Sequence, residues 1–117
     1  HNTVGTVAQT LKELMDNPAV WQDSELTGDK LVHLVGTNRT YIQQAAKQLG
    51  FENLSDMINR RRIDYVCQQL RNDPNTPVQT LFIDAGYRSR TTAWRHFTSI
   101  VGCTPSEFVE RHADDIK

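Results

Sequence analysis

The chain has 117 residues, of which 38% are hydrophobic and 23% charged, which is enough for one compact domain or two small helical lobes. No apolar run approaches the roughly 20 residues that a membrane span needs, so we expect no membrane contact. The formal net charge of −1, taken alone, argues against a nucleic-acid partner.

Apolar residues recur at three- and four-residue steps along nearly the whole chain, which is the period of an α-helix. The sequence shows no strand pattern and no low-complexity linker, so the expected fold class is all-α. A polar connector containing Trp21 follows the first helix. The pattern predicts about seven helices, at residues 4–16, 27–35, 38–49, 53–72, 77–85, 89–100 and 104–112.

Several of these helices carry recognisable start signals. Thr27, Asn38 and Ser89 are suitable N-caps for the helices that follow them. Pro77 suits the first position of a helix, and TPSE at residues 104–107 is a capping-box sequence.

The helix at 38–49 has two different faces. Arg39, Thr40, Gln43 and Gln44 share a polar stripe, because they are spaced at i, i+1, i+4 and i+5. These side chains donate and accept hydrogen bonds but do not pair as opposite charges do, which favours recognition of a ligand. For this helix alone, an ordinary solvated face is the simpler interpretation.

The charge distribution changes that interpretation. Residues 38–98 hold nine Lys or Arg and five acids, net +4, whereas residues 1–37 have net −3 and residues 99–117 net −2. The basic excess therefore coincides with the stripe. A local basic face matters more for binding a polyanion than the total charge does.

Cysteines and histidines give no indication of a chemical site. Cys67 and Cys103 lie in apolar, helical contexts that fit a reducing cytoplasm, so a disulfide is not favoured. The four histidines show no paired spacing with the cysteines, so we expect no metal and no cofactor. Because no acid–base pair or nucleophile cluster appears, we expect no catalytic residue and no enzymatic activity.

The chain contains an internal repeat. Each unit is a short helix, a tight turn with Gly, and a second helix with a polar stripe. That is the layout of a helix-turn-helix, whose second helix lies in the DNA major groove. The matched pairs, at an offset of 50 before the turn and 51 after it, are Leu31/Leu81, Gly36/Gly86, Asn38/Ser89, Arg39/Arg90 and Thr40/Thr91.

The residue types in both stripes fit base recognition. The second stripe consists of Arg90, Thr91, Trp94 and Arg95. Arg can bond guanine O6 and N7, Gln can bond adenine N6 and N7, and Thr and Trp can contact the thymine methyl group. Duplication of a helical hairpin for packing alone does not explain why such side chains recur at matching exposed positions.

The helix between the units has a suitable length. Residues 54–71 correspond to roughly 27 Å of helix, and successive major-groove faces on one side of DNA lie about 34 Å apart. We therefore expect one chain to contact two adjacent grooves without dimerising.

Two segments carry a resemblance to a known family. LVHLVGTNRTYIQQAAKQLGFENLSDMINRRRIDYVCQQL at 31–70 and VQTLFIDAGYRSRTTAWRHFTSIVGCTPSEF at 78–108 resemble the DNA-binding domain of the AraC/XylS family of bacterial transcription regulators. The most specific parts are GY at 86–87, the spacing of Arg95 and Phe97, and GCTPSEF at 102–108.

The resemblance implies two helix-turn-helix units joined by a long linking helix, with double-stranded DNA and RNA polymerase as partners. It implies DNA contacts from Arg39, Thr40, Gln43, Gln44, Arg90, Thr91, Trp94 and Arg95. It also implies a bacterial cytoplasmic protein. Because the chain starts at His1 rather than Met, we expect a sensory or dimerisation domain to be missing from it.

The expected domain organisation follows from this. An N-terminal helix and connector occupy residues 1–26, and the AraC-type domain occupies residues 27–110. The parts are the first helix-turn-helix at 27–50, the linking helix at 53–72, the second helix-turn-helix at 77–101, the closing helix at 104–112 and a tail at 113–117.

The chain departs from the family pattern in its core positions. Val32 and Phe82 stand where a small Ala is usual, and Ala46 and Ala93 where a bulky residue is usual. We hypothesise an exchange that conserves volume within each unit, which cores tolerate best. The Gly expected after the first recognition helix is displaced to Gly50, which leaves the tilt of that unit open.

Four further residues are interpreted one by one. The resemblance gives Arg62 a structural role in the linking helix, whereas Arg60 and Arg61 either contact phosphate or are solvated. Trp21 is expected to pack in the core or as a hydrophobic staple of a helix.

The leading hypothesis is sequence-specific DNA binding that regulates transcription. The alternative is a helical protein-interaction module without DNA binding. A methyl-transfer repair enzyme with a similar helical module would need a cysteine in a metal site, and neither Cys67 nor Cys103 has such neighbours.

Overall fold

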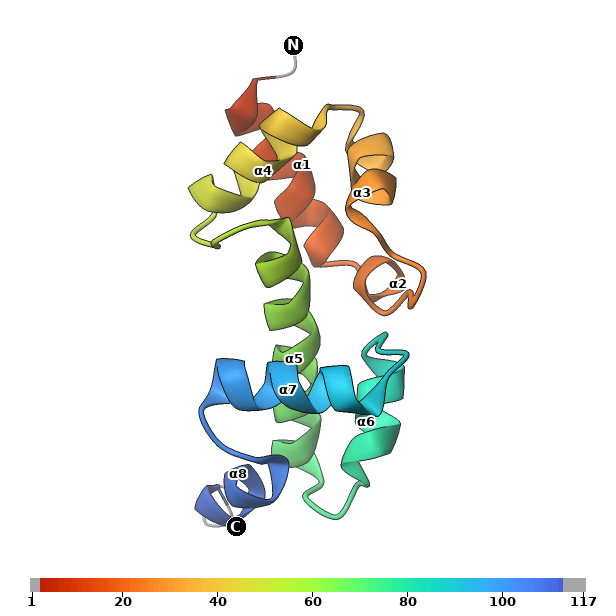
Figure 1. The fold of residues 1–117 in the computed structure, drawn as a ribbon, viewed down its shortest axis with the longest axis vertical. Helices are drawn as coiled ribbons and strands as arrows, with labels where there is room; N and C mark the ends of the chain where they lie inside the picture. The colour runs from red at the N-terminus through yellow and green to blue at the C-terminus, as the bar shows by residue number, and fades with distance from the viewer. Residues whose placement is uncertain (1–2, 113–117) are drawn as a thin grey trace. The chain divides into compact units, whose positions relative to one another are not determined.

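The computed structural model describes residues 3–112, which form eight helices and no strand (Figure 1). The all-α class expected from the sequence is confirmed. The tail expected at residues 113–117 lies outside the described residues. In chain order the helices are α1 (Val4–Met15), α2 (Pro18–Trp21), α3 (Gly28–Val35), α4 (Arg39–Gln48), α5 (Leu54–Asn72), α6 (Val78–Asp84), α7 (Arg90–Val101) and α8 (Pro105–Arg111).

Two details differ from the sequence-based expectation. The segment after α1 contains the short helix α2, whose N-cap Asn17 accepts a hydrogen bond from the N–H of Ala19. Four residues are too few to show a helical period, so the sequence pattern missed this helix. Helix α6 begins one residue later than predicted, because Pro77 is its N-cap rather than its first residue.

The chain divides into two compact units, residues 1–59 and residues 60–117. The first unit holds α3 and α4, which correspond to the first expected helix-turn-helix. The second holds α6 and α7, which correspond to the second. Helix α5 begins in the first unit and ends in the second.

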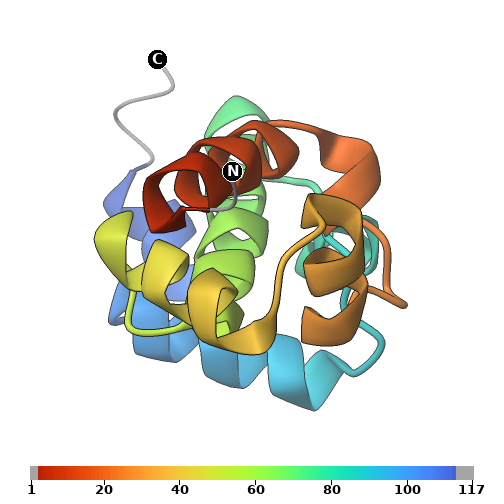
Figure 2. The ribbon, with the colours of Figure 1, turned by 90° about the horizontal axis from the view of Figure 1, so that it is seen from above.

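In the first unit, α1 supplies much of the packing for the helix-turn-helix. It runs alongside α4 and also contacts α3, as Figures 1 and 2 show. The buried face of α1 includes Val7 and Leu11, and α4 contributes Ile42, each at most 1% exposed. Trp21 is 1% exposed, which confirms the expected core packing. The outward face of α4 is thereby left to solvent.

In the second unit, the second half of α5, together with α6, α7 and α8, surrounds one hydrophobic core. Three phenylalanines connect these helices edge to face. The ring centroids of Phe82 and Phe97 lie 6.2 Å apart, and those of Phe97 and Phe108 lie 5.9 Å apart. Such contacts add specific geometry to the burial of large rings, so α7 is fixed on its inner face by aromatic packing.

The sequence repeat is also present in the backbone of the turns. Gly36 and Gly86 both have positive φ angles, 77° and 107°, which favour a residue without a side chain. In each turn the residue after the glycine donates its N–H to the carbonyl oxygen five residues earlier. The N···O distance is 3.1 Å from Thr37 to Val32 and 3.0 Å from Tyr87 to Phe82. Helices α3 and α6 therefore end in the same kind of C-terminal cap.

The second helices of the two helix-turn-helix motifs, α4 and α7, also start in the same way. The side chain of Asn38 accepts a hydrogen bond of 2.8 Å from the N–H of Tyr41, and that of Ser89 accepts one of 3.3 Å from Thr92. These are the N-caps that the sequence predicted. The first residues of α4 and α7, Arg39 and Arg90, thus hold matching positions at the exposed starts of two helices.

Candidate nucleic-acid interface

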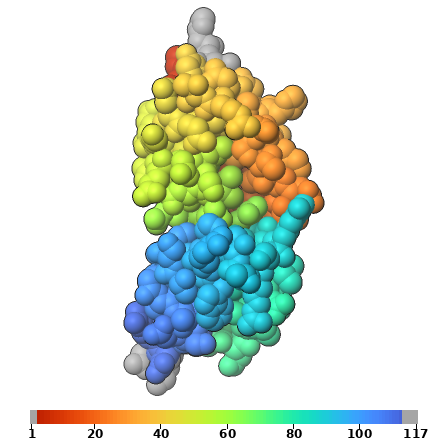
Figure 3. Space-filling model, in the orientation of Figure 1, coloured from red at the N-terminus to blue at the C-terminus, as the bar shows by residue number. Residues whose placement is uncertain are grey.

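The polar stripe of α4 faces solvent. Arg39, Thr40, Gln43 and Gln44 are all exposed, whereas Ile42, Ala45 and Ala46 on the opposite side are buried. Figure 3 shows α4, in yellow, at the surface of the first unit. The structure therefore brings all four predicted residues of this stripe onto one accessible helix face.

The stripe of α7 is less uniform. Arg90, Thr91 and Arg95 are exposed, and Figure 3 shows α7, in blue, at the surface of the second unit. Trp94 is half-buried, packs against the core and borders an open groove of about 320 Å³. The groove is also lined by Val78 of α6 and by Pro105 and Val109 of α8. Trp94 thus has a packing role in addition to the predicted DNA contact.

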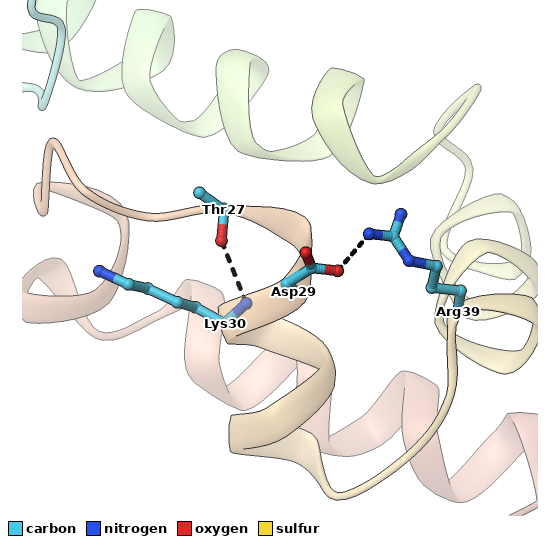
Figure 4. Close-up of polar contacts among 4 residues, drawn as sticks. All are labelled: Thr27, Asp29, Lys30 and Arg39. Atoms are coloured by element: carbon cyan, nitrogen blue, oxygen red, sulfur yellow. Dashed lines mark hydrogen bonds and ion pairs between the residues drawn. The ribbon is translucent and has the colours of Figure 1, made fainter.

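Arg39 makes an ion pair that the sequence analysis did not predict. Its Nη2 donates a hydrogen bond to Oδ1 of Asp29, in the first turn of α3 (Figure 4). The start of α3 is fixed independently, because Thr27 Oγ1 accepts a 3.2 Å hydrogen bond from the N–H of Lys30. The pair joins α3 to α4, the two helices of the first helix-turn-helix.

Gln43 has a structural contact as well. Its Oε1 accepts a hydrogen bond of 2.9 Å from the N–H of Leu54, the first residue of α5. This bond satisfies one of the backbone donors that every helix start leaves without an intrahelical partner. An amide oxygen has a second lone pair and the amide NH₂ remains a donor, so the contact limits how Gln43 can meet a base but does not remove its capacity to do so.

The inner side of α7 is held by a stack of three side chains. The guanidinium of Arg62 lies 5.4 Å from the centroid of the Tyr87 ring, and the ring of His96 stacks on the same tyrosine at 5.9 Å. Arg62 is only 9% exposed, so most of its side chain lies within the fold. The stack contacts α7 through His96, the neighbour of the exposed Arg95.

Charge and burial set the protonation of this stack. Burial raises the pKa of Tyr87 well above its ordinary value, against a lowering by the charge of Arg62. Burial, followed by the charges of Arg95 and Arg62, lowers the pKa of His96. His96 is therefore neutral at neutral pH and leaves Arg95 as the charged group on this part of α7.

The basic run in α5 contains different environments. Arg60 is exposed, whereas Arg61 is half-buried and donates a hydrogen bond of 3.4 Å to Asp64 one turn further along the helix. Surface pairs of this kind contribute little to stability. Phosphate contact by Arg60 or Arg61 stays a prediction.

Metal clusters, cysteines and membrane spans can each be described within residues 3–112. Among residues 3–112, no group of three or more His, Cys, Asp or Glu side chains is arranged to hold a metal ion. Both cysteines are buried and free. None of the helices in this range is both long enough and apolar enough to cross a membrane.

Comparison with known proteins agrees with the geometry. A family model described as a helix-turn-helix domain matches residues 31–111, which span both units. The chain belongs to this AraC/XylS-type helix-turn-helix family of DNA-binding transcription regulators, which is not a class of enzymes.

One curated protein shows a similarity along nearly its full length. The regulatory protein SoxS of Salmonella typhimurium strain LT2 is 28% identical to this chain over 105 residues, which cover 90% of this chain and 94% of SoxS. No solved structure gave a significant match.

Proposed function

We propose that this chain regulates transcription by inserting α4 and α7 into adjacent major grooves of one promoter site. The observation that supports this most is the match between two helix starts. Each has a side-chain N-cap, then an exposed Arg and an exposed Thr, on a helix whose other face is buried. A helix-turn-helix uses the N-terminal residues of its second helix to touch base edges.

Sequence recognition is assigned to the two stripes. Arg39, Arg90 and Arg95 have the fork of donors that suits guanine O6 and N7. Gln44 suits adenine, and Thr40 and Thr91 suit the thymine methyl group or a phosphate. Gln43 and Trp94 have fewer atoms available for base contacts than the other stripe residues, because Gln43 also caps α5 and Trp94 also packs on the core.

Affinity is assigned mainly to phosphate contacts. Such contacts release counterions from the DNA, so binding weakens steeply as salt concentration rises. The exposed Arg60 of α5 is the clearest candidate for one of them. RNA polymerase is proposed as the protein partner, because a promoter-bound regulator acts by recruiting or positioning it.

A gel-shift titration tests the proposal. The chain would be titrated against a duplex selected from a random pool and against unselected DNA, each at several salt concentrations. We expect tighter binding to the selected duplex and a steep salt dependence on both. The control is a variant with Arg39, Arg90 and Arg95 replaced by Ala, which should keep its helical circular dichroism because all three side chains are exposed.

The same titration distinguishes the alternative function. A helical protein-interaction module would show no enrichment of any sequence and no complex at low salt. That result would contradict DNA recognition by either helix.

A further inference from the structure

We propose that Asp29 is a positioning residue for Arg39, and that this device operates in the first unit only. The inference rests on the proposed function, since it concerns how Arg39 meets a base. The carboxylate of Asp29 holds the guanidinium of Arg39 before DNA arrives (Figure 4).

The geometry is that of a bridge across the helix-turn-helix. Asp29 is the second residue of α3, and Arg39 is the first residue of α4. Their side chains are 71% and 75% exposed, so the pair stands at the surface of the unit and not in its core. The bridge therefore links the two helices at the point where α4 would enter a groove.

Stability does not account for this pair. Exposed ion pairs are weakened by water and salt and by the side-chain freedom they remove. The start of α3 is already capped by Thr27, and that of α4 by Asn38. The folded unit thus has no evident need of the bridge, and its main consequence is to restrict the rotamers of Arg39.

Restricting an arginine in advance favours recognition. A long, flexible side chain loses rotamer freedom when it binds, and this cost falls when the folded protein has already restricted it. Asp29 accepts a hydrogen bond from one N–H of Nη2, and the remaining N–H groups of the guanidinium are sufficient for the two acceptors of guanine. The bridge and the base contact are therefore compatible.

The carboxylate has an opposite effect on general affinity. A negative charge near the DNA repels phosphate, so its removal should strengthen binding to any duplex. Positioning acts only where Arg39 faces its preferred base. The two effects have opposite signs on the selected duplex, whereas only the charge effect acts on unselected DNA. Comparing the two DNAs therefore separates them.

The second unit supplies an internal comparison. At the repeat offset of 50, Gln79 stands in the place of Asp29, as the second residue of α6. Its neutral amide can accept a hydrogen bond from arginine but cannot form the ion pair that a carboxylate forms with it. Arg90, the counterpart of Arg39, thus starts α7 without an acid at the matching position.

The experiment compares Asp29→Ala with a matched variant, Glu52→Ala. Glu52 is an exposed acid of the same unit, and its side chain is not bonded to Arg39, so both variants remove one negative charge. Binding is measured to the selected duplex, to single-base-pair substitutions of it and to unselected DNA. Thermal unfolding monitored by circular dichroism checks that both variants fold.

Both variants should bind unselected DNA more tightly than the native chain does. Only Asp29→Ala should lose discrimination at the base pair that Arg39 contacts, by severalfold. That is part of the roughly 5- to 150-fold expected when a whole bidentate contact is lost. Gln79→Asp should sharpen discrimination at the base pair that Arg90 contacts.

Arg39→Ala separates failure of the inference from failure of the proposed function. If Arg39→Ala abolishes a base preference while Asp29→Ala behaves like Glu52→Ala, Asp29 acts only through its charge and the positioning role is overturned. If Arg39→Ala changes no base preference, Arg39 does not read sequence, and both the inference and the assignment of Arg39 are wrong.

Discussion

Arg95 and His96 are neighbours in α7, but their environments differ. Arg95 is exposed, whereas His96 stacks against the buried ring of Tyr87. Because His96 is held neutral and directed inward, it offers no second positive charge to DNA. At the residue scale, base preference in the second unit should therefore depend on Arg90 and Arg95.

Replacing Arg90 or Arg95 by Ala should weaken binding to the selected duplex far more than to unselected DNA. The expected loss on the selected duplex is about 1–3 kcal/mol for each bidentate contact removed. Quantitative gel shifts at one fixed salt concentration measure it. Arg111→Ala is the control, because Arg111 is an exposed arginine of α8 outside both stripes. Equal losses on both DNAs would show that Arg90 and Arg95 contact only phosphate.

A second residue-scale prediction concerns pH. Burial raises the pKa of Cys67 to about 11, against a lowering by Arg71. An unfolded thiol ionises near its ordinary pKa of 9.0, while the folded thiol keeps its proton. Between these values the folded state binds more protons, so the free energy of unfolding should fall as pH rises.

Urea unfolding from pH 8 to 10.5 tests this linkage. Cys67→Ala removes the titrating group and should show a shallower fall with pH than the native chain does. Other groups, including the buried Tyr87, also titrate at alkaline pH, so the difference between the two proteins is the informative quantity. Parallel curves would show that the thiol is not protected by burial.

The sequence could predict the contacts made by near neighbours along the chain, but not those made across the fold. The N-caps at Asn38 and Ser89 involve residues three apart and follow from local sequence rules. The bridge from Asp29 to Arg39 and the bond from Leu54 to Gln43 span ten and eleven residues. Their formation depends on how two helices meet, which helical periodicity does not specify.

At the scale of elements, the packing of α6 against α7 tests the hypothesis of exchanged volumes. Phe82 of α6 is 1% exposed and lies edge to face with Phe97 of α7, while Ala93 of α7 is fully buried. A large residue on α6 thus accompanies a small one on α7 in the same core. In the first unit the counterpart Val32 is only half-buried, although Ala46 is fully buried.

Phe82→Ala should destabilise the second unit by roughly 3–5 kcal/mol, as for other buried phenylalanines. If Phe82 occupies volume that a larger residue at position 93 would otherwise fill, adding Ala93→Phe to this variant should recover much of the loss. Denaturant unfolding of the two single variants and the double variant measures the coupling. Strictly additive losses would contradict the exchange.

At the scale of the whole molecule, asymmetry is the feature with consequences for the DNA site. The two helix-turn-helix units share their caps and turns, but their stripes differ, and the acid that bonds the leading arginine of the first, Asp29, is matched by Gln79 in the second. A symmetric dimer reads a palindrome, because its two-fold axis is matched in the DNA. A chain with two unlike stripes has no such axis.

We therefore predict an asymmetric site in which one chain protects two neighbouring major-groove segments. Helix α5 connects the units through 19 residues, about 28 Å of helix, which is shorter than the roughly 34 Å between successive groove faces. A helix cannot stretch, so the difference should be met by bending of the DNA or by weaker engagement of one unit. We expect the first unit to engage more weakly, because Gln43 is partly occupied at the start of α5 and the sequence resemblance implies that Gly50 stands one residue early. Hydroxyl-radical footprinting and a stoichiometric titration on a selected duplex measure both properties. A two-fold symmetric footprint that requires two chains would contradict the prediction, and protection of a single groove segment would show that only one stripe binds.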